Sequence, residues 1–140
     1  MIGRPASGRY QKQLEKAMEG LPNFHYRGVQ SIDEVNLMLA RAHVLVNTSL
    51  YEGFPNTFVQ AWFRRVPVVS LNVDPDDVLK KEGLGFHSQS FEGVTRDAEQ
   101  LITDPRLRES MGTKAHEYAL RHHSAAPNLA KIASLLCGVQ

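Results

Sequence analysis

Short apolar runs alternate along the chain with longer segments of helical periodicity. Two of these runs, at residues 43–47 and 66–71, are rich in β-branched residues and contain few polar ones. Strands of this kind are typically covered on both faces, as in a parallel sheet. Weaker strand candidates lie at residues 24–28 and 85–87, and residues 1–3 could be the end of a further strand.

Between and after these runs, apolar residues recur at intervals of three and four, which predicts helices. Ser31 and Glu34 have the spacing of a capping box, and Asp104 is expected to cap the helix that begins at the proline after it. The predicted helices cover residues 10–18, 31–42, 55–65, a short segment after Asp74, and residues 91–102, 105–122 and 126–136.

The order of these elements defines the expected fold class. Strands and helices that alternate with short connections indicate βαβ units, which have parallel strands and right-handed crossovers. We therefore expect an α/β fold with a Rossmann-like parallel sheet flanked by helices. The C-terminal third of the chain is expected to be purely helical.

Composition narrows the function classes. The 140 residues fit a single domain, and 16 Lys+Arg against 15 Asp+Glu give a formal net charge of +1, which argues against a charge-driven nucleic-acid partner. Cys137 is the only cysteine, so one chain can form neither a disulfide framework nor a thiolate metal site. No signal peptide and no spanning apolar run are recognisable, so we expect a cytoplasmic protein.

The most informative stretch is SLYEGFPNTFVQ at residues 49–60, which follows the second predicted strand. In open α/β sheets, ligands bind beyond the carboxyl ends of the strands, in loops that lead into helices. Gly53 allows a close backbone turn, and Pro55 suits the first helical position. The N–H groups expected to point outward at the positive end of the helix dipole, toward a phosphate or sugar hydroxyls, are those of Gly53, Phe54, Asn56 and Thr57.

The helix that follows has two distinct faces. Asn56, Gln60 and Arg64 recur at every fourth position and form a polar stripe, which could line a ligand cleft. The opposite face is mainly apolar, and its Trp62 is expected in the core. The alternative is a solvated helix face, with Glu52 serving only as a charge near the helix N-terminus.

Two other clusters could carry chemistry. Asp74, Asp76 and Asp77 could hold Mg²⁺, although an Asp-Pro turn that caps a helix is the commoner explanation. His122 and His123 lie at a predicted helix end, where partial positive charge is favoured.

The stretch EGFP at residues 52–55, the apolar helix after it, and the strand RVPVV at residues 65–69 resemble the central motif of GT-B glycosyltransferases of the large retaining group often called family 4. The order of elements along nearly the whole chain is also similar. The resemblance implies the C-terminal donor-binding domain of an enzyme that transfers a sugar from a nucleotide diphosphate sugar to an unknown acceptor in glycan or polysaccharide synthesis.

The resemblance also assigns roles to individual positions. Glu52 would be the catalytic residue that lies against the hydroxyls of the donor sugar. Gln60 stands where the family has a second Glu that binds the ribose, and Asp74 lies in a loop that faces the donor site in the family. The backbone contacts implied are Gly53 and Phe54 to the sugar, Asn56 and Thr57 to the diphosphate, and Gly28 and Val29 to the base. No cofactor or metal is implied, because helix dipoles and basic side chains stabilise the leaving group.

The chain departs from the family pattern at Gln60 and at Arg65, where the family usually has Gly. The resemblance implies that the first strand of the donor domain and the whole N-terminal acceptor domain lie outside residues 1–140. These residues are therefore expected to be one donor-binding domain of a two-domain enzyme and inactive alone. The full enzyme could associate peripherally with a membrane. Two alternatives stay open: a non-catalytic α/β interaction domain, and a GT-B nucleotide-sugar epimerase or phosphorylase.

Overall fold

The computed structural model describes residues 1–3 and 7–137. The chain divides into two compact units, Met1–Leu37 and Met38–Gln140, and each is described by itself. Among the described residues, no helix is both long and apolar enough to cross a membrane.

In the first unit, side chains cap the starts of both helices, and the capping box of the second is the one that the sequence predicted. Helix α1 (Gly8–Met18) begins after Ser7, whose hydroxyl accepts a hydrogen bond from the backbone N–H of Tyr10. Helix α2 (Ile32–Leu39) starts in this unit at the capping box: the N–H of Ser31 donates to Glu34 Oε2 at 2.8 Å, and the N–H of Glu34 donates to Ser31 Oγ at 3.2 Å. These bonds stabilise the ionised carboxylate, so the pKa of Glu34 is lowered, first by the backbone bond and then by the hydroxyl of Ser31.

The prediction of a strand at residues 24–28 was wrong, because no strand is assigned in the described part of this unit. Residues 1–3 do lie beside this segment: the N–H of Arg27 donates to the carbonyl of Met1, and the N–H of Gly3 donates to that of Gly28, both at 2.9 Å. The N-terminal amine of Met1 also donates to the carbonyl of His25 at 2.6 Å. An alternating apolar run becomes a strand only where a neighbouring strand supplies a regular ladder, and these three main-chain bonds to residues 1–3 do not extend into one.

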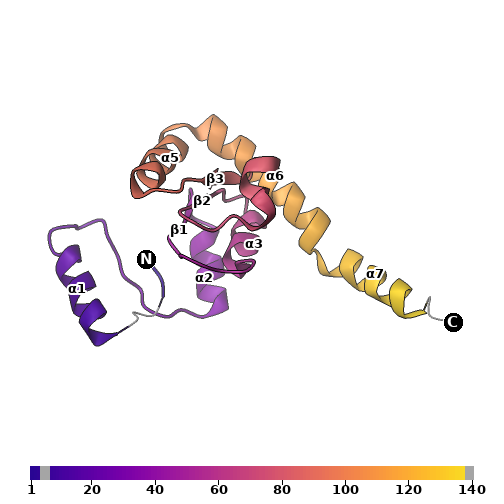
Figure 1. The fold of residues 1–140 in the computed structure, drawn as a ribbon, viewed down its shortest axis with the longest axis horizontal. Helices are drawn as coiled ribbons and strands as arrows, with labels where there is room; N and C mark the ends of the chain where they lie inside the picture. The colour runs from indigo at the N-terminus through magenta and orange to yellow at the C-terminus, as the bar shows by residue number, and fades with distance from the viewer. Residues whose placement is uncertain (4–6, 138–140) are drawn as a thin grey trace. The chain divides into compact units, whose positions relative to one another are not determined.

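The second unit is built on a three-stranded sheet. Strands β1 (Leu45–Asn47), β2 (Val68–Ser70) and β3 (Gly85–His87) are parallel and lie in the order β1-β2-β3 (Figure 1). Each strand is separated from the next by a helical segment, so the units are βαβ crossovers. The α/β fold class expected from the sequence is confirmed, although the first two strands are shorter than the apolar runs that predicted them.

The helices of this unit lie in the expected order. Helix α6 contacts α3, α4 and α5 along its length, while α5 packs against β2 and α4 against β3 (Figure 1). Asp104 caps α6 as predicted, since its Oδ1 accepts from the N–H of Leu107 at 3.0 Å. The bounds are α3 (Asn56–Trp62), the 3-10 turn η1 (Pro75–Asp77), α4 (Val78–Glu82), α5 (Phe91–Thr103), α6 (Pro105–His123) and α7 (Ala125–Cys137).

The core forms between the sheet and α3, α4, α5 and α6. Trp62 is fully buried there, as the helical spacing predicted. Strand β2 is buried along its whole length, but Val46 in β1 is 42% exposed, so the prediction that β1 is covered on both faces was wrong. The other fully buried side chains include Phe58, Leu79, Leu101, Val68 and Val69.

Helix α3 ends earlier than predicted, and Arg65 lies beyond it in a left-handed conformation with φ of 59°. The N–H groups of Arg65 and Val66 return to the carbonyls of Trp62 and Ala61, both at 3.0 Å, and close the helix end. Arg65 therefore adopts the conformation that a glycine takes most easily, at the position where the family that the sequence resembles usually has glycine.

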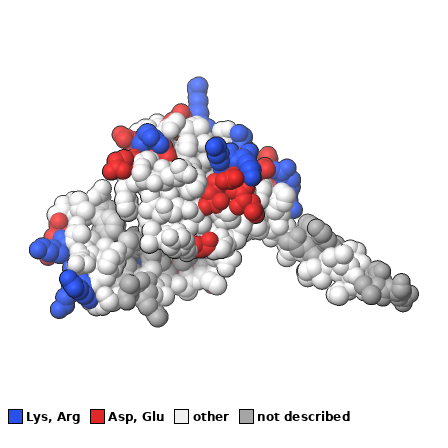
Figure 2. Space-filling view, viewed as in Figure 1, with Lys and Arg blue, Asp and Glu red and all other residues white. Residues whose placement is uncertain are grey.

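The face visible in Figure 2 carries both acidic and basic side chains. Figure 2 shows acidic side chains gathered over the region of α4, with basic side chains close beside them. One such pair is Lys81 and Asp77, whose side chains approach to 3.3 Å.

Candidate functional site

The carboxyl ends of the three strands bring polar side chains into one row. In the parallel register, Asn47 at the end of β1 pairs with Ser70 in β2, and Ser70 pairs with His87 in β3. Neighbouring strands lie about 4.8 Å apart, so this row spans about 10 Å. This edge of the sheet is where ligands of α/β proteins bind.

Glu52 lies at this edge, tied to the end of β1. Its Oε1 accepts a hydrogen bond from Asn47 Nδ2 at 3.1 Å, and Asn47 Oδ1 accepts from the N–H of Ser49 at 2.9 Å. The carbonyl of Asn47 also accepts from the N–H of Leu71, just beyond β2, at 2.8 Å. Asn47 thus fixes the start of the loop, while Glu52 remains exposed and keeps acceptor capacity for a ligand.

The backbone after Glu52 turns into α3. Pro55 is the residue before the helix, not its first residue as predicted, and Asn56 begins α3. The prediction of free donors agrees with the hydrogen bonds of the described residues, among which none accepts from the N–H groups of Gly53, Phe54, Asn56 or Thr57. These donors can hold hydroxyl or phosphate oxygens.

Phe54 anchors this turn in an aromatic cluster. Its ring centroid lies 5.9 Å from that of Trp62, nearly edge-on, and 5.2 Å from that of His123 at the end of α6. Tyr118 packs edge-on against Trp62 at 5.4 Å. A turn that carries an exposed carboxylate is therefore held by rings from both α3 and α6.

Burial in this cluster shifts two titrating groups. It lowers the pKa of His123, and the neighbouring His122 lowers it further, so the expectation of favoured positive charge at the helix end is wrong for His123. Burial also raises the pKa of Tyr118, with a smaller contribution from the carboxylate of Glu82. His123 Nε2 and Trp62 Nε1 are both buried without a hydrogen-bond partner among the described residues.

Gln60 lies one turn into α3 and is half-buried. Its backbone carbonyl accepts from Arg64 Nη1 at 2.9 Å. Because α3 ends at Trp62, only Asn56 and Gln60 of the predicted polar stripe lie in the helix, and Arg64 lies beyond its end.

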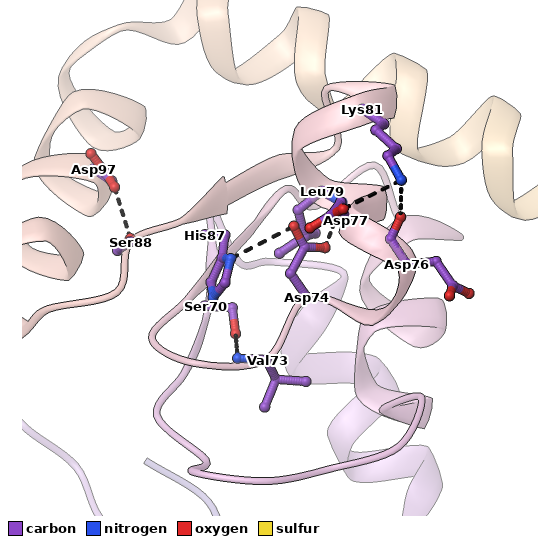
Figure 3. Close-up of polar contacts among 10 residues, drawn as sticks. All are labelled: Ser70, Val73, Asp74, Asp76, Asp77, Leu79, Lys81, His87, Ser88 and Asp97. Atoms are coloured by element: carbon purple, nitrogen blue, oxygen red, sulfur yellow. Dashed lines mark hydrogen bonds and ion pairs between the residues drawn. The ribbon is translucent and has the colours of Figure 1, made fainter.

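Asp74 lies in the loop after β2, next to the end of β3 (Figure 3). Its Oδ1 accepts from the N–H of Leu79, in the first turn of α4, at 2.8 Å, although Asp77 is the residue directly before that helix. Its Oδ2 lies 3.9 Å from His87 Nδ1. Among the described residues, no cluster of three or more His, Cys, Asp or Glu side chains could hold a metal ion.

Gly28 and Val29 belong to the first unit. Gly28 has φ of +66°, and its carbonyl accepts from Gly3. Val29 is 64% exposed. Of the residues at the sheet edge, sequence reasoning missed Asn47, Ser70 and His87 as site residues. The end of an apolar run followed by a polar residue was the signal for the first two.

Comparison with known proteins identifies the family to which the chain belongs. The sequence model of the family described as "Glycosyl transferases group 1" matches residues 1–104. Glycosyltransferase 1 domain-containing protein 1 of Xenopus tropicalis is 22% identical over 125 residues, which cover 89% of this chain and 36% of that protein. The lipopolysaccharide core biosynthesis glycosyltransferase LpsE of Rhizobium meliloti (strain 1021) is 28% identical over 88 residues, which cover 61% of this chain and 26% of that protein.

Solved structures share the fold. Crystal structures of Anabaena Alr3699/HepE in complex with UDP and with UDP-glucose superpose with TM-scores of 0.80 and 0.78, at 20% and 21% identity, over 99% of this chain and 40% of theirs. The chain thus spans well under half the length of these relatives. Since the family match covers most of the chain, this protein belongs to the glycosyl transferases group 1 family.

Proposed function

We propose that this chain is the donor-binding domain of a retaining glycosyltransferase and that it binds a UDP-sugar. The observation that carries the proposal is the exposed carboxylate of Glu52, held by Asn47 at the carboxyl end of β1 in a chain of this family. The proposal is also supported by the similarity to Anabaena Alr3699/HepE, whose crystal structures contain UDP and UDP-glucose.

In this proposal, Glu52 is the catalytic residue and accepts hydrogen bonds from the hydroxyls of the donor sugar. A charged acceptor makes stronger bonds to hydroxyls than a neutral one does. The N–H groups of Gly53 and Phe54 hold the same sugar, and Gln60 accepts from the ribose hydroxyls.

The N–H groups of Asn56 and Thr57, at the start of α3, stabilise the charge that develops on the departing diphosphate. Fixed backbone donors need no reorganisation when the sugar–phosphate bond breaks, which is the general advantage of such sites. The proposal requires no metal ion, because donors of this kind supply the electrostatic stabilisation.

The relatives are much longer than this chain, so the acceptor is proposed to bind a second domain outside these residues. Transfer of the sugar with retention of its anomeric configuration is accordingly proposed only for a protein that contains both the donor-binding and the acceptor-binding domain. The anomeric configuration of its product, read by NMR, tests the retaining mechanism directly.

Donor binding is testable on the chain itself. We expect UDP-glucose to shift the backbone amide resonances of Gly53, Phe54, Asn56 and Thr57 in a titration followed by NMR, with UDP shifting those of Asn56 and Thr57. Amides of helix α5, which packs against β2 and α6, serve as the internal control and should not shift. Saturating UDP-glucose that left the four amides unmoved would contradict the proposal.

A further inference from the structure

Beyond the loop after β1, the carboxyl edge of the sheet carries a second pair of side chains, Asp74 and His87. His87 ends β3 and shares a register row with Ser70 and Asn47. Asn47 is the residue that holds Glu52. A ligand bound at Glu52 therefore needs to extend across β2 to reach His87.

The carboxylate of Asp74 is held rigidly and is incompletely paired. Its side chain is only 1% exposed, and its Oδ1 is fixed by the N–H of Leu79 at 2.8 Å. Its Oδ2 is buried and has no hydrogen bond within the described part of the chain. Burying a carboxylate oxygen without a donor is costly, so a donor is expected to complete the site.

One candidate donor is His87 Nδ1, 3.9 Å from Asp74 Oδ2 (Figure 3). A hydrogen bond between nitrogen and oxygen is about 2.7 to 3.2 Å long, so these two atoms are roughly 1 Å too far apart to form one. A small rotation of the imidazole would close it. Closure would fix the proton on Nδ1 and leave Nε2 as an acceptor, because the partner of one ring nitrogen sets the role of the other.

His87 is accessible to a ligand. Its side chain is 23% exposed. Its Nε2 is bonded to none of the described residues and is not among the buried unpartnered atoms.

The loop around the pair is fixed by the backbone. The hydroxyl of Ser70 accepts from the N–H of Val73 at 3.2 Å, and the carbonyl of Ser70 accepts from the N–H of Ser88 at 2.8 Å. These bonds tie the ends of β2 and β3 to the loop that carries Asp74, so the pair is organised before any ligand arrives.

The charges near the end of β3 favour a neutral group. Besides Asp74, the same loop carries Asp76 and Asp77. Lys81 Nζ, from α4, contacts this loop but is already engaged by Asp77 and by the carbonyl of Asp76. A phosphate would meet net negative charge there, whereas a sugar hydroxyl can donate to His87 Nε2 without that penalty.

We propose that His87, oriented by Asp74, binds a sugar hydroxyl at the end of β3 and thereby helps to select the sugar that the enzyme handles. The inference rests on the proposed function, because the sugar is placed by the donor site at Glu52. His87 contacts the ligand and Asp74 is a positioning residue.

The test compares UDP with UDP-glucose on the 15N-labelled chain, reading the imidazole nitrogens of His87 and the amides of Gly53 to Thr57. We expect UDP-glucose, but not UDP, to shift the ring nitrogens of His87. In Asp74→Asn, the amide oxygen can still accept from Leu79 while the amide NH₂ faces His87, so the proton is expected to move from Nδ1 to Nε2 without loss of the fold. A purely structural role for Asp74 would leave the tautomer unchanged and would overturn its assignment as the positioning residue.

His87→Phe keeps a ring in place and is expected to lower the affinity for UDP-glucose about fivefold, with the affinity for UDP within twofold of wild type. The matched control is His43→Phe, an exposed histidine before β1 at the opposite edge of the sheet, which should change neither affinity. Equal losses for both ligands, or no loss for either, in His87→Phe would overturn the proposal.

Two outcomes locate the source of the hydroxyl. A ring shift with UDP-glucose assigns the hydroxyl to the donor sugar and supports the proposal. A ring shift only with methyl α-glucoside in the presence of saturating UDP would assign it to a free sugar and would overturn the proposal. If neither moves the ring while the amides of Gly53 to Thr57 respond to UDP-glucose, the inference fails and the proposed function stands. If those amides do not respond, the proposed function fails as well.

Discussion

Gly112 in α6 is predicted to be required by close packing, although a glycine inside a helix is normally a weakness. A Cβ built at Gly112 would lie 2.2 Å from the carbonyl oxygen of Arg65 and 3.0 Å from its carbonyl carbon. Both are backbone atoms of the left-handed turn that closes α3, so neither can rotate away. Gly112→Ala therefore forces α6 to move from α3 by about 1 Å to restore an ordinary contact.

The magnitude follows from two opposing effects. Replacing a helix glycine by alanine gains about 1 kcal/mol in helix propensity. Overpacking costs about 1 to 3 kcal/mol and occasionally more. The upper end of this range applies here, because the new methyl group would clash with main-chain atoms. Retreat of α6 would also loosen the fully buried Ala115 and Ala119. We expect a net loss of about 1 to 2 kcal/mol, which for a chain of this size lowers Tm by roughly 3 to 6 °C.

The assay is urea unfolding followed by circular dichroism, with Gly8→Ala as the matched control. A Cβ at Gly8, at the start of α1, would meet nothing within 4 Å, so that variant should be neutral or slightly stabilising. A Gly112→Ala chain that was more stable than wild type would refute the reasoning, because it would mean that the turn at Arg65 does not press on α6.

Two further predictions concern the site. Burial lowers the pKa of His123, so as pH falls through the ordinary value of about 6.5 the unfolded state takes up the proton first and stability decreases. The Tm of wild type should therefore fall more between pH 7.5 and 5 than the Tm of His123→Phe. An equal fall in Tm for the two proteins would contradict this. Gln60→Glu should strengthen UDP binding about fivefold, since a charged acceptor binds the ribose hydroxyls more strongly than an amide, and calorimetry that finds weaker or unchanged binding would remove Gln60 from the ribose site.

Features decided by local chemistry could be predicted from the sequence. The capping box of Ser31 and Glu34 and the cap at Asp104 depend on residues a few positions apart, and both were correct. The strand at residues 24–28 was not, because an alternating pattern describes only one partner of a ladder, and the segment beside it, residues 1–3, makes only a few main-chain bonds to it.

The site was predictable only in part, for the same reason. The loop from Glu52 to Thr57 carries its own signal: a carboxylate, a glycine and a proline between a strand and a helix. By contrast, the contacts of Phe54 with His123 and of Asp74 with His87 join segments distant in the chain. They depend on how α6 and β3 pack, and no local pattern encodes that.

The central claim is that Glu52 binds the sugar of the donor, and Glu52→Gln tests it most directly. The substitution keeps the shape of the side chain and removes its charge, so the hydrogen bonds to the sugar lose about 1 kcal/mol. We expect the affinity for UDP-glucose, measured by NMR titration, to fall about fivefold while that for UDP stays within twofold. Equal effects on both ligands, or no effect on UDP-glucose, would contradict the account.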